Sequence, residues 1–191
     1  FTKKLDRFFT CHDSMGPNAQ SDITGLIGQY AHGNEPSHHI AYLYTYAGEQ
    51  WKTAEKVRYV MDQFYTDQPD GIIGNEDCGQ MSAWYVLSAM GFYQVNPCDG
   101  VFVFGSPVLN RAEMTVGSGR TFTMEAVGNS AENKYIEKAY LNGKPYGKSY
   151  ITYEEILRGG TLKFIMGSKP NKSFGRSRNS RPVVLNRIGN N

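Results

Sequence analysis

Apolar residues recur at helical spacing through the first half of the chain. They predict helices from His39 to Ala47, from Trp51 to Tyr65 and from about Gly79 to Met90, and Leu5, Phe8 and Phe9 indicate a further half-turn near the start. Glycines stand where the first and third of these helices would end, and a Pro-Asp-Gly sequence predicts a turn after the second. The three helices are apolar over most of their surface, so we expect them to be buried against many other helices.

The second half of the chain changes to short, alternating, β-rich segments. They are Val101–Phe104, Ala112–Val116, Thr121–Val127 and Thr161–Met166, with Gly, Asn and Pro between them. Asn142-Gly143 is a strong hairpin-turn signal. Strands of this length and spacing are typical of an antiparallel sandwich. The sequence therefore predicts an α+β fold with a helical region over 1–97 and a β-sandwich-like region over 98–191.

Composition excludes several classes of function. The formal net charge of +2 gives no reason to expect nucleic acid or an anionic membrane as a partner. The chain has no apolar run of about 20 residues, so no membrane span is expected. It also opens without an apolar leader, so we expect any export signal to lie outside this sequence. Basic residues gather only between 169 and 187, which we interpret as an exposed or wrapping segment. Three cysteines without a CxxC spacing make a zinc site unlikely and leave their disulfide status open.

Two polar segments stand directly before expected helices, and each begins Gly-Asn-Glu. The first runs from Gly33 to His39 and the second from Gly74 to Gln80. Each has a purely structural interpretation. Asn34 or Glu35 before Pro36 suits a helix N-cap, and Asp77 followed by Gln80 is close to a capping box.

Capping accounts for only part of these residues, because a helix needs one cap and each segment supplies several polar groups. Carboxylate and amide oxygens are the ligands that calcium prefers. Adjacent carboxylates can also hold and deprotonate a water, as the general base of an inverting glycosidase does. Helices whose polar entry loops share one end suit an (α/α) barrel with a central pocket. The residues alone thus favour a hydrolase or carbohydrate site.

Both segments, with their continuations into Ile40-Ala-Tyr-Leu-Tyr44 and Met81-Ser-Ala-Trp84, resemble the family-92 glycoside hydrolases. Val95-Asn-Pro97, Phe104-Gly-Ser-Pro107 and Lys169-Pro-Asn171 are similar to further landmarks of that family, in the same order. The resemblance runs from about residue 20 to the end of the chain.

This resemblance implies a calcium-dependent, inverting exo-α-mannosidase that trims mannose from N-glycans or mannan. The family fold is an N-terminal β-sandwich followed by an (α/α)₆ barrel, of which this chain would be the C-terminal part. The second motif implies Asp77 as general base with Glu76 assisting. The first implies Asn34 and Glu35 as ligands of Ca²⁺. The remaining polar residues of the two motifs are expected to contact mannose: His38, His39 and Gln80.

An inverting glycosidase also needs a carboxylic acid about 6.5–9.5 Å from its base. In the family that acid lies upstream of the first motif, and Asp6, Asp13 and Asp22 do not stand in its setting. We therefore expect the chain to be inactive without the N-terminal half of the enzyme. Two alternatives remain open: a carbohydrate-binding fragment based on residues 98–191, and a purely structural segment that closes the barrel. A barrel glycosidase of another specificity is also possible. The family's substrates further imply a secreted, periplasmic or cell-surface location.

Overall fold

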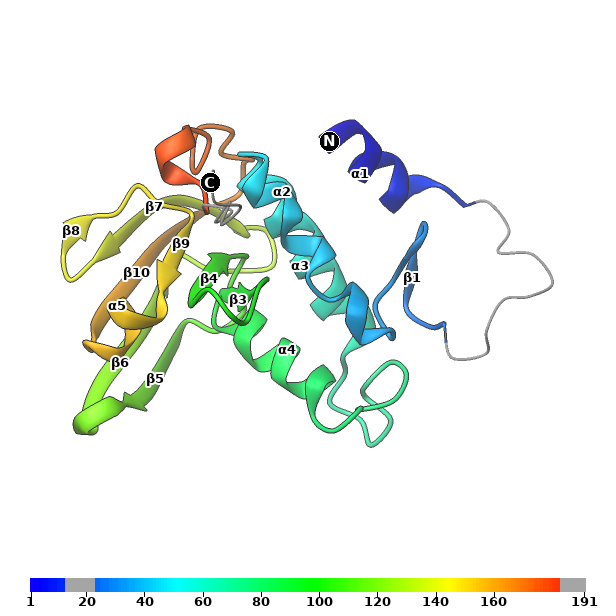
Figure 1. Ribbon diagram of the computed structural model, residues 1–191, viewed down its shortest axis with the longest axis horizontal. Coiled ribbons are helices and arrows are strands. Elements are labelled where there is room, and N and C mark those ends of the chain that lie inside the picture. The colour runs from blue at the N-terminus through cyan, green and yellow to red at the C-terminus, as the bar shows by residue number, and fades with distance from the viewer. Residues whose placement is uncertain (13–22, 183–191) are drawn as a thin grey trace, which may run out of the picture.

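The structure is a computed structural model that describes residues 1–12 and 23–182. Most helices lie on one side of the molecule and most β-strands on the other, as Figure 1 shows. Exceptions include a short hairpin, β1 (Leu26–Ile27) and β2 (Tyr30–Ala31), among the helices and the helix α5 (Tyr153–Leu157) among the strands. The expected α+β fold class, with helices followed by a sandwich-like β region, is confirmed.

The described residues of the helical half form four α-helices and two 3₁₀ turns. They are α1 (Thr2–Thr10), η1 (Glu35–Ser37), η2 (Ile40–Tyr42), α2 (Leu43–Tyr46), α3 (Gln50–Phe64) and α4 (Gln80–Ala89). The helix expected from His39 is thus a 3₁₀ turn continued by one α-helical turn. It ends at Tyr46, and Gly48 follows two residues later with a φ of +81°, which only glycine adopts readily. Gly91 likewise follows two residues after the end of α4, with a φ of +94°.

Trp84 lies at the centre of the helical core and is fully buried. The other buried members include Tyr30, Tyr42, Tyr44, Val57, Val60 and Met61. On the outer side of α4, Ser82, Ala83 and Val86 stay exposed, and Val86 is 54% accessible. A single exposed apolar residue is normal on a protein surface, so the packing of further helices here stays a prediction.

The β half contains two sheets. The larger has the order β5 (Arg111–Val116), β6 (Arg120–Val127), β10 (Gly160–Gly167), β7 (Tyr135–Leu141) and β8 (Lys144–Pro145). The smaller joins β3 (Phe92–Gln94), β4 (Val101–Phe104) and β9 (Tyr150–Thr152). Neighbouring strands are antiparallel except β6 and β10, which are parallel, a pairing that the sequence analysis did not include.

The two sheets share one core, which makes this half a sandwich. Phe104 of the smaller sheet meets Phe164 of the larger edge to face, with ring centroids 5.0 Å apart. Alternate residues of β6 and β10 point into this core: Phe122, Met124 and Ala126, and Leu162, Phe164 and Met166. The hairpin predicted at Asn142-Gly143 joins β7 to β8, with φ of +51° and +77° at its two central residues.

The helical and β halves are joined by more than the chain. β3 precedes the expected boundary at 97/98 and pairs with β4 after it, so that boundary falls inside a hairpin. Arg58 of α3 is buried and donates hydrogen bonds to Ser106 Oγ (3.1 Å), to the Ser130 carbonyl (3.3 Å), to the Pro107 carbonyl and to Asn129 Oδ1. These hydrogen bonds attach α3 to the sandwich.

The basic segment near the end of the chain wraps back over the helices, as expected. Ser149 donates its backbone N–H to Ser180, and Phe174 is buried. The Lys172 ammonium lies 5.5 Å from the Trp51 ring, and the Arg181 guanidinium packs against Gly48. Arg187 lies outside the described residues. No helix within the described ranges is long and apolar enough to cross a membrane.

Candidate active site

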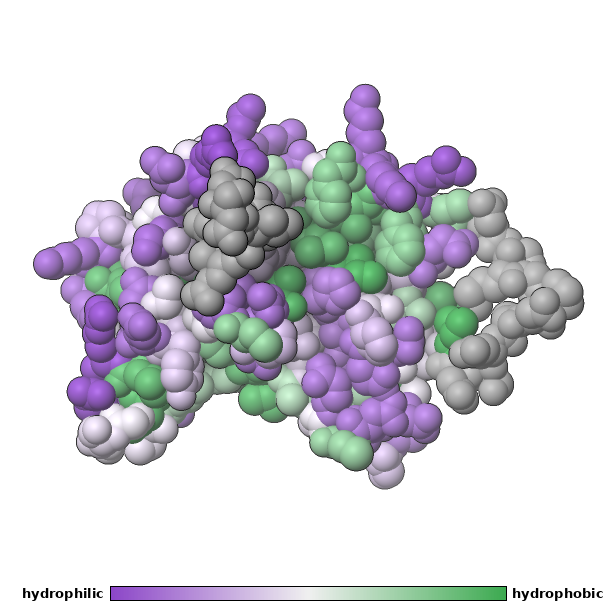
Figure 2. Space-filling model, in the orientation of Figure 1, coloured by the Kyte–Doolittle hydropathy of each residue, from purple (hydrophilic) through white to green (hydrophobic). Residues whose placement is uncertain are grey.

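The two Gly-Asn-Glu segments, Gly33–His39 and Gly74–Gln80, are separated in sequence but meet at the same end of the helices (Figure 1). A Cβ placed on Gly74 would lie 3.4 Å from Gly33 Cα, so the two backbones are almost in contact. Hydrophilic residues cover this end of the molecule in Figure 2. The structure thus brings together the two motifs that the sequence identified separately.

Thr24 explains why both motifs begin with glycine. Its Oγ1 would lie 2.0 Å from a Cβ on Gly33 and 2.9 Å from a Cβ on Gly74. Its backbone carbonyl also accepts a hydrogen bond from Gly33 N at 3.1 Å. The Thr24 side chain therefore fills the space that any other residue at either position would need.

The first motif does not use its side chains for capping. Asn34 stands at the N-cap of η1 but makes no side-chain cap hydrogen bond there, and it is exposed. Glu35 is half-buried, and its Oε1 is shielded from solvent without a hydrogen-bond partner among the described residues. The capping interpretation is therefore wrong for Asn34, and Glu35 keeps an oxygen that a cation or a polar ligand would satisfy.

The second motif places Asp77 on a strained backbone. Asp77, Cys78 and Gly79 have φ of +46°, +58° and +91°, a run of left-handed residues directly before α4. Such conformations are unfavourable for residues other than glycine and concentrate at functional sites. Asp77 is exposed, and the N-cap position of α4 belongs to Gly79 without any side-chain bond, so the capping box expected between Asp77 and Gln80 does not form.

Glu76 takes the helix-capping role instead. Its Oε1 accepts from Ser82 N at 2.8 Å and its Oε2 from Ser82 Oγ at 2.6 Å. These hydrogen bonds from Ser82 lower the pKa of Glu76. Its carboxylate is thus ionised and held against the first turn of α4, beside Asp77 in sequence.

His38 is buried, with hydrogen bonds at both ring nitrogens. Its Nε2 donates to the His32 carbonyl at 3.0 Å, and its Nδ1 accepts from Gln80 Nε2 at 3.0 Å. Burial lowers its pKa, which keeps the ring neutral, as this pattern of one donor and one acceptor requires. Both ring nitrogens of His38 are thus occupied by protein groups, and its contact with mannose stays a prediction.

Gln80 and His39 are placed differently from His38. Gln80 is half-buried and donates a second hydrogen bond, to Tyr93 Oη at 3.1 Å. His39 lines a hollow of about 400 Å³ together with α1 residues Leu5 and Phe8. Apolar side chains gather around this hollow in Figure 2, between α1 and α2. His39 thus lies on the α1 side of its loop, while His38 faces α4.

The sequence analysis missed the residues under this site. His32 stacks on His38 with ring centroids 4.6 Å apart. Its Nδ1 accepts from the Tyr30 hydroxyl at 2.8 Å, and its Nε2 donates to the Tyr65 hydroxyl at 2.7 Å. Burial, with the neighbouring His38, lowers the pKa of His32 to about 3. Nothing in the spacing of these residues indicates that they converge, because they come from a short hairpin and from the end of α3.

Three aspartates precede the first motif. Asp6 is engaged elsewhere: its carboxylate accepts from Lys52 Nζ at 2.8 Å and from the Tyr44 hydroxyl at 2.9 Å. Asp13 and Asp22 lie outside the described residues. In the part of the chain that the structure describes, no three His, Cys, Asp or Glu side chains gather as a metal cluster.

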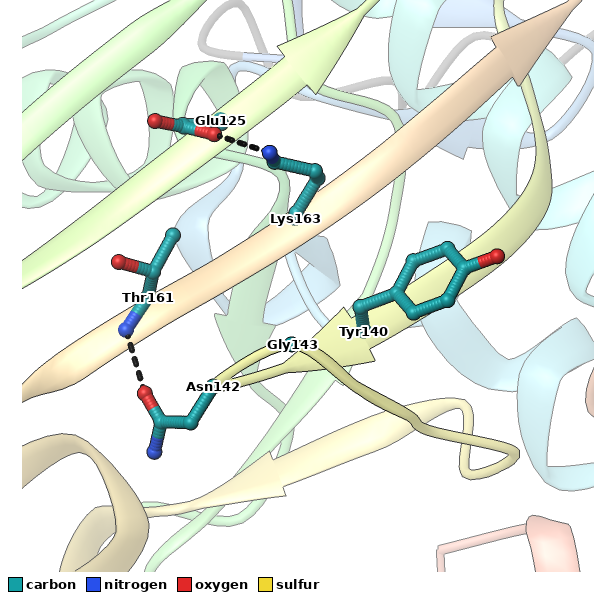
Figure 3. A pocket seen from close by; sticks show the side chains of 6 residues that line it. All are labelled: Glu125, Tyr140, Asn142, Gly143, Thr161 and Lys163. Carbon is teal, nitrogen blue, oxygen red and sulfur yellow. Dashed lines mark hydrogen bonds and ion pairs between the residues drawn. The ribbon is translucent and has the colours of Figure 1, made fainter.

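A separate hollow of about 440 Å³ lies on the outer face of the larger sheet (Figure 3). Lys163 and Glu125 form an ion pair of 3.0 Å across its floor, and Asn142 Oδ1 accepts from Thr161 N at 2.8 Å. Tyr140 borders it with its ring. None of these residues belongs to the two motifs, so the hollow is distinct from the candidate active site.

Comparisons with known proteins agree with the sequence motifs. A family model described as the glycosyl hydrolase family 92 catalytic domain matches residues 1–168. A protein of Arthroderma benhamiae, named an uncharacterized secreted glycosidase, is 34% identical over 199 residues, which cover 94% of this chain and 25% of that protein.

Solved structures give the same result. A family GH92 α-mannosidase of Bacteroides thetaiotaomicron, in complex with mannoimidazole, is 42% identical with a TM-score of 0.92, over 97% of this chain and 24% of that one. A family GH92 inverting mannosidase of the same organism is 37% identical with a TM-score of 0.80, over 95% of this chain and 26% of that one. The chain thus spans about a quarter of the length of these relatives.

Proposed function

The chain belongs to glycosyl hydrolase family 92, and from this premise we propose that it is the C-terminal part of an inverting, calcium-dependent exo-α-mannosidase. In this proposal it supplies the general base and the metal-binding side of the active site. The observation that carries the proposal is the meeting of the two Gly-Asn-Glu loops at Gly33 and Gly74, with Asp77 exposed beside them and free of a capping role.

Asp77 is the general base in this proposal. Its exposed carboxylate can accept a proton from a water that attacks the anomeric carbon from the face opposite the leaving group. The carbon–oxygen bond to the leaving sugar breaks as the new bond forms, so the configuration inverts. Glu76, fixed by Ser82, lies next to Asp77 in the same turn. Its negative charge favours transfer of the water proton to Asp77.

Asn34 and Glu35 are the proposed calcium-binding residues. Glu35 Oε1, buried without a partner among the described residues, and the exposed Asn34 amide are oxygen donors of the kind that a hard cation takes. Calcium uses six to eight oxygens, so the rest must come from backbone, water, sugar hydroxyls or the remainder of the enzyme. When bound, the ion would hold sugar hydroxyls and favour a distorted ring. His39 and the free carbonyl side of Gln80 remain proposed sugar contacts.

The substrate proposed is a terminal α-linked mannose, most specifically the α-1,2 linkage of N-glycans or mannan. Support comes from relatives whose printed descriptions are α-mannosidase and inverting mannosidase, one of them bound to mannoimidazole. The relative described as a secreted glycosidase supports export of the whole protein. The general acid is proposed to reside in the part of the enzyme upstream of the described motifs, so this chain alone is expected to be inactive.

Mannose release from α-1,2-mannobiose tests the proposal. The full-length enzyme, assayed with calcium and then with a chelator, should release mannose only with calcium, and the 191-residue chain alone should release none. ¹H NMR of the first product should give β-mannose, because inversion converts the α linkage. An α-configured first product, or activity of the full-length enzyme that the chelator leaves unchanged, would contradict the mechanism.

A carbohydrate-binding role for residues 98–191 is the second candidate, and the hollow in Figure 3 is where it would act. Tyr140 offers an aromatic ring, and the Lys163–Glu125 pair offers polar groups beside it. Both tryptophans of the chain lie before residue 98, which weakens this candidate. Titration of mannobiose into the full-length protein would separate the two roles: binding lost in Tyr140→Ala but kept in Asp77→Asn would favour the sheet. A purely structural role predicts no binding at either place.

A further inference from the structure

One side chain from each motif crosses between the two loops. His38 follows Glu35 by three residues, and Gln80 follows Asp77 by three residues. Gln80 Nε2 donates to His38 Nδ1 at 3.0 Å. In addition, Trp84 Nε1, one turn further along α4, donates to the His38 carbonyl at 3.2 Å. Helix α4 is thus attached to the first loop through the side chain and the backbone of one residue.

This contact has only one arrangement of protons. His38 Nε2 donates to the His32 carbonyl, so Nδ1 carries the lone pair and must accept. The two N–H groups of the Gln80 amide are then both used, one by His38 and one by Tyr93. The His32 ring stacked beneath is itself held between the Tyr30 and Tyr65 hydroxyls. Both ring nitrogens of His38 and both N–H groups of the Gln80 amide are therefore occupied, and of these side-chain polar atoms only the Gln80 amide oxygen has no partner among the described residues.

We infer that the His38–Gln80 bridge is the positioning element that sets Asp77 relative to Glu35, and that neither its imidazole nor its amide N–H groups act on the substrate. This inference rests on the proposed function, because it assigns the two carboxylates to one site. Misplacement of such a group by about 1 Å costs on the order of 100-fold in rate. The bridge therefore acts on the reaction through the two loops that it joins.

Gln80→Met removes both hydrogen bonds while keeping the length of the side chain. It also removes the amide oxygen proposed to contact the sugar, so it is compared with His38→Ala, which breaks the same bridge and leaves that oxygen in place. In the full-length enzyme we expect kcat to fall about 10- to 100-fold, with a smaller change in KM. Amide hydrogen exchange should quicken in both loops, 33–37 and 74–79, because they lose their shared anchor. His38→Asn keeps an acceptor near the former Nδ1 position, so it should retain more kcat than His38→Ala.

Ser88→Ala is the matched control. It removes another buried hydrogen bond of α4, from Tyr42 Oη at 2.7 Å, at the end of the helix away from the loops. It should lower the melting temperature as Gln80→Met does, yet leave kcat and loop exchange unchanged.

The outcomes distinguish the positioning role of the bridge from the proposed function. Unchanged loop exchange in Gln80→Met, or faster exchange with unchanged kcat, would overturn the positioning role. An equal fall of kcat in Ser88→Ala would overturn it too, since loss of stability would then suffice. If the wild-type enzyme releases no mannose, the proposed function fails, while the exchange data still decide whether the bridge positions the two loops.

Discussion

Asp77 holds its carboxylate on a backbone that few residues adopt. Its φ of +46° is followed by +58° at Cys78 and +91° at Gly79. The carboxylate satisfies no N–H of α4, because Glu76 bonds to Ser82 instead. Strain of about 1–3 kcal/mol per residue persists only where the surroundings impose it. A strained, exposed carboxylate beside a second polar loop is better explained by chemistry than by local stability.

Replacement of Asp77 by asparagine should remove activity without disturbing the turn. Asparagine tolerates the left-handed region about as well as aspartate does, so the backbone cost is small. Loss of a general base costs about 10²–10⁴-fold in kcat. We expect Asp77→Asn to lose mannose release by that factor with a melting temperature within about 2 °C of wild type. A variant with more than a tenth of the wild-type kcat would show that another group is the base.

Gly33→Ala should destabilise the junction of the two loops. Its new Cβ would approach Thr24 Oγ1 to 2.0 Å, and Gly33 has no positive φ, so the effect is purely steric. Overpacking of this kind costs about 1–3 kcal/mol. Urea unfolding should detect the loss, and Thr24→Ala in the same chain should recover part of it.

Gly143→Ala supplies the contrasting case. Gly143 has a φ of +77° and nothing within 4 Å of a new Cβ, so only backbone strain of about 1 kcal/mol is expected there. Thr24→Ala should give no recovery in that background. Equal recovery at both positions would mean that Thr24 does not set the spacing of the loops.

At this scale the sequence predicted which residues converge but not what holds them. The motif residues were identifiable because polar side chains crowd the start of apolar helices. Thr24 and His32 were not identifiable from the sequence, because they contact their partners only once separate segments of the chain have folded together. The role of His38 meets a related limit: a histidine inside a motif has the same sequence signature whether its ring faces a ligand or the core.

The short helix α5 (Tyr153–Leu157) shows how elements are fixed locally. Thr152 caps it, with its Oγ1 accepting from Glu155 N, and Glu155 Oε2 accepts from Thr152 N at 2.9 Å. Tyr146 also donates to Glu155 Oε2, at 3.0 Å. This reciprocal capping box lets five residues form a helix between strands β9 and β10.

Stability should therefore depend on the ionisation of Glu155. Burial would raise its pKa, but the hydrogen bonds from Thr152 and Tyr146 lower it overall. A folded-state pKa below the unfolded value stabilises the fold at higher pH, and the stabilisation disappears as pH falls through the folded pKa. Glu155→Gln should cost about 1–2 kcal/mol at pH 7. The difference between the two proteins should shrink below about pH 4 in urea titrations. A difference that stays constant down to pH 3 would contradict this account.

Strands and helices were largely predictable from periodicity, whereas strand partners were not. Alternation marks β6 and β10 as strands because one face of each fills the sandwich core. Their parallel pairing joins Phe122 to Gly160 across the hairpin and α5, and no local signal encodes it. The boundary expected at 97/98 meets the same limit: periodicity does not show that β3, before the boundary, pairs with β4 after it.

At the scale of the whole molecule, the proposed active site lies at one end of the helices (Figure 1). The motif residues at this end include Asp77, Glu35 and Asn34. Val86, in the helix α4 that follows the second motif, is exposed. The chain spans about a quarter of its relatives. In the proposed function, the general acid comes from the part of such a protein that this chain does not span.

Calcium binding should therefore report on how much of the metal site this chain carries. A ligand that binds only the folded state adds about 2.7 kcal/mol at a concentration of 100 times its Kd. The full-length enzyme should melt several degrees lower after chelation, and Glu35→Gln should remove that dependence. The isolated chain should gain little at the same calcium concentration, because Asn34 and Glu35 fall short of six oxygen ligands. Differential scanning calorimetry with calcium and with chelator measures both. A shift of equal size in the isolated chain would mean that the site is complete here and that only the acid lies elsewhere.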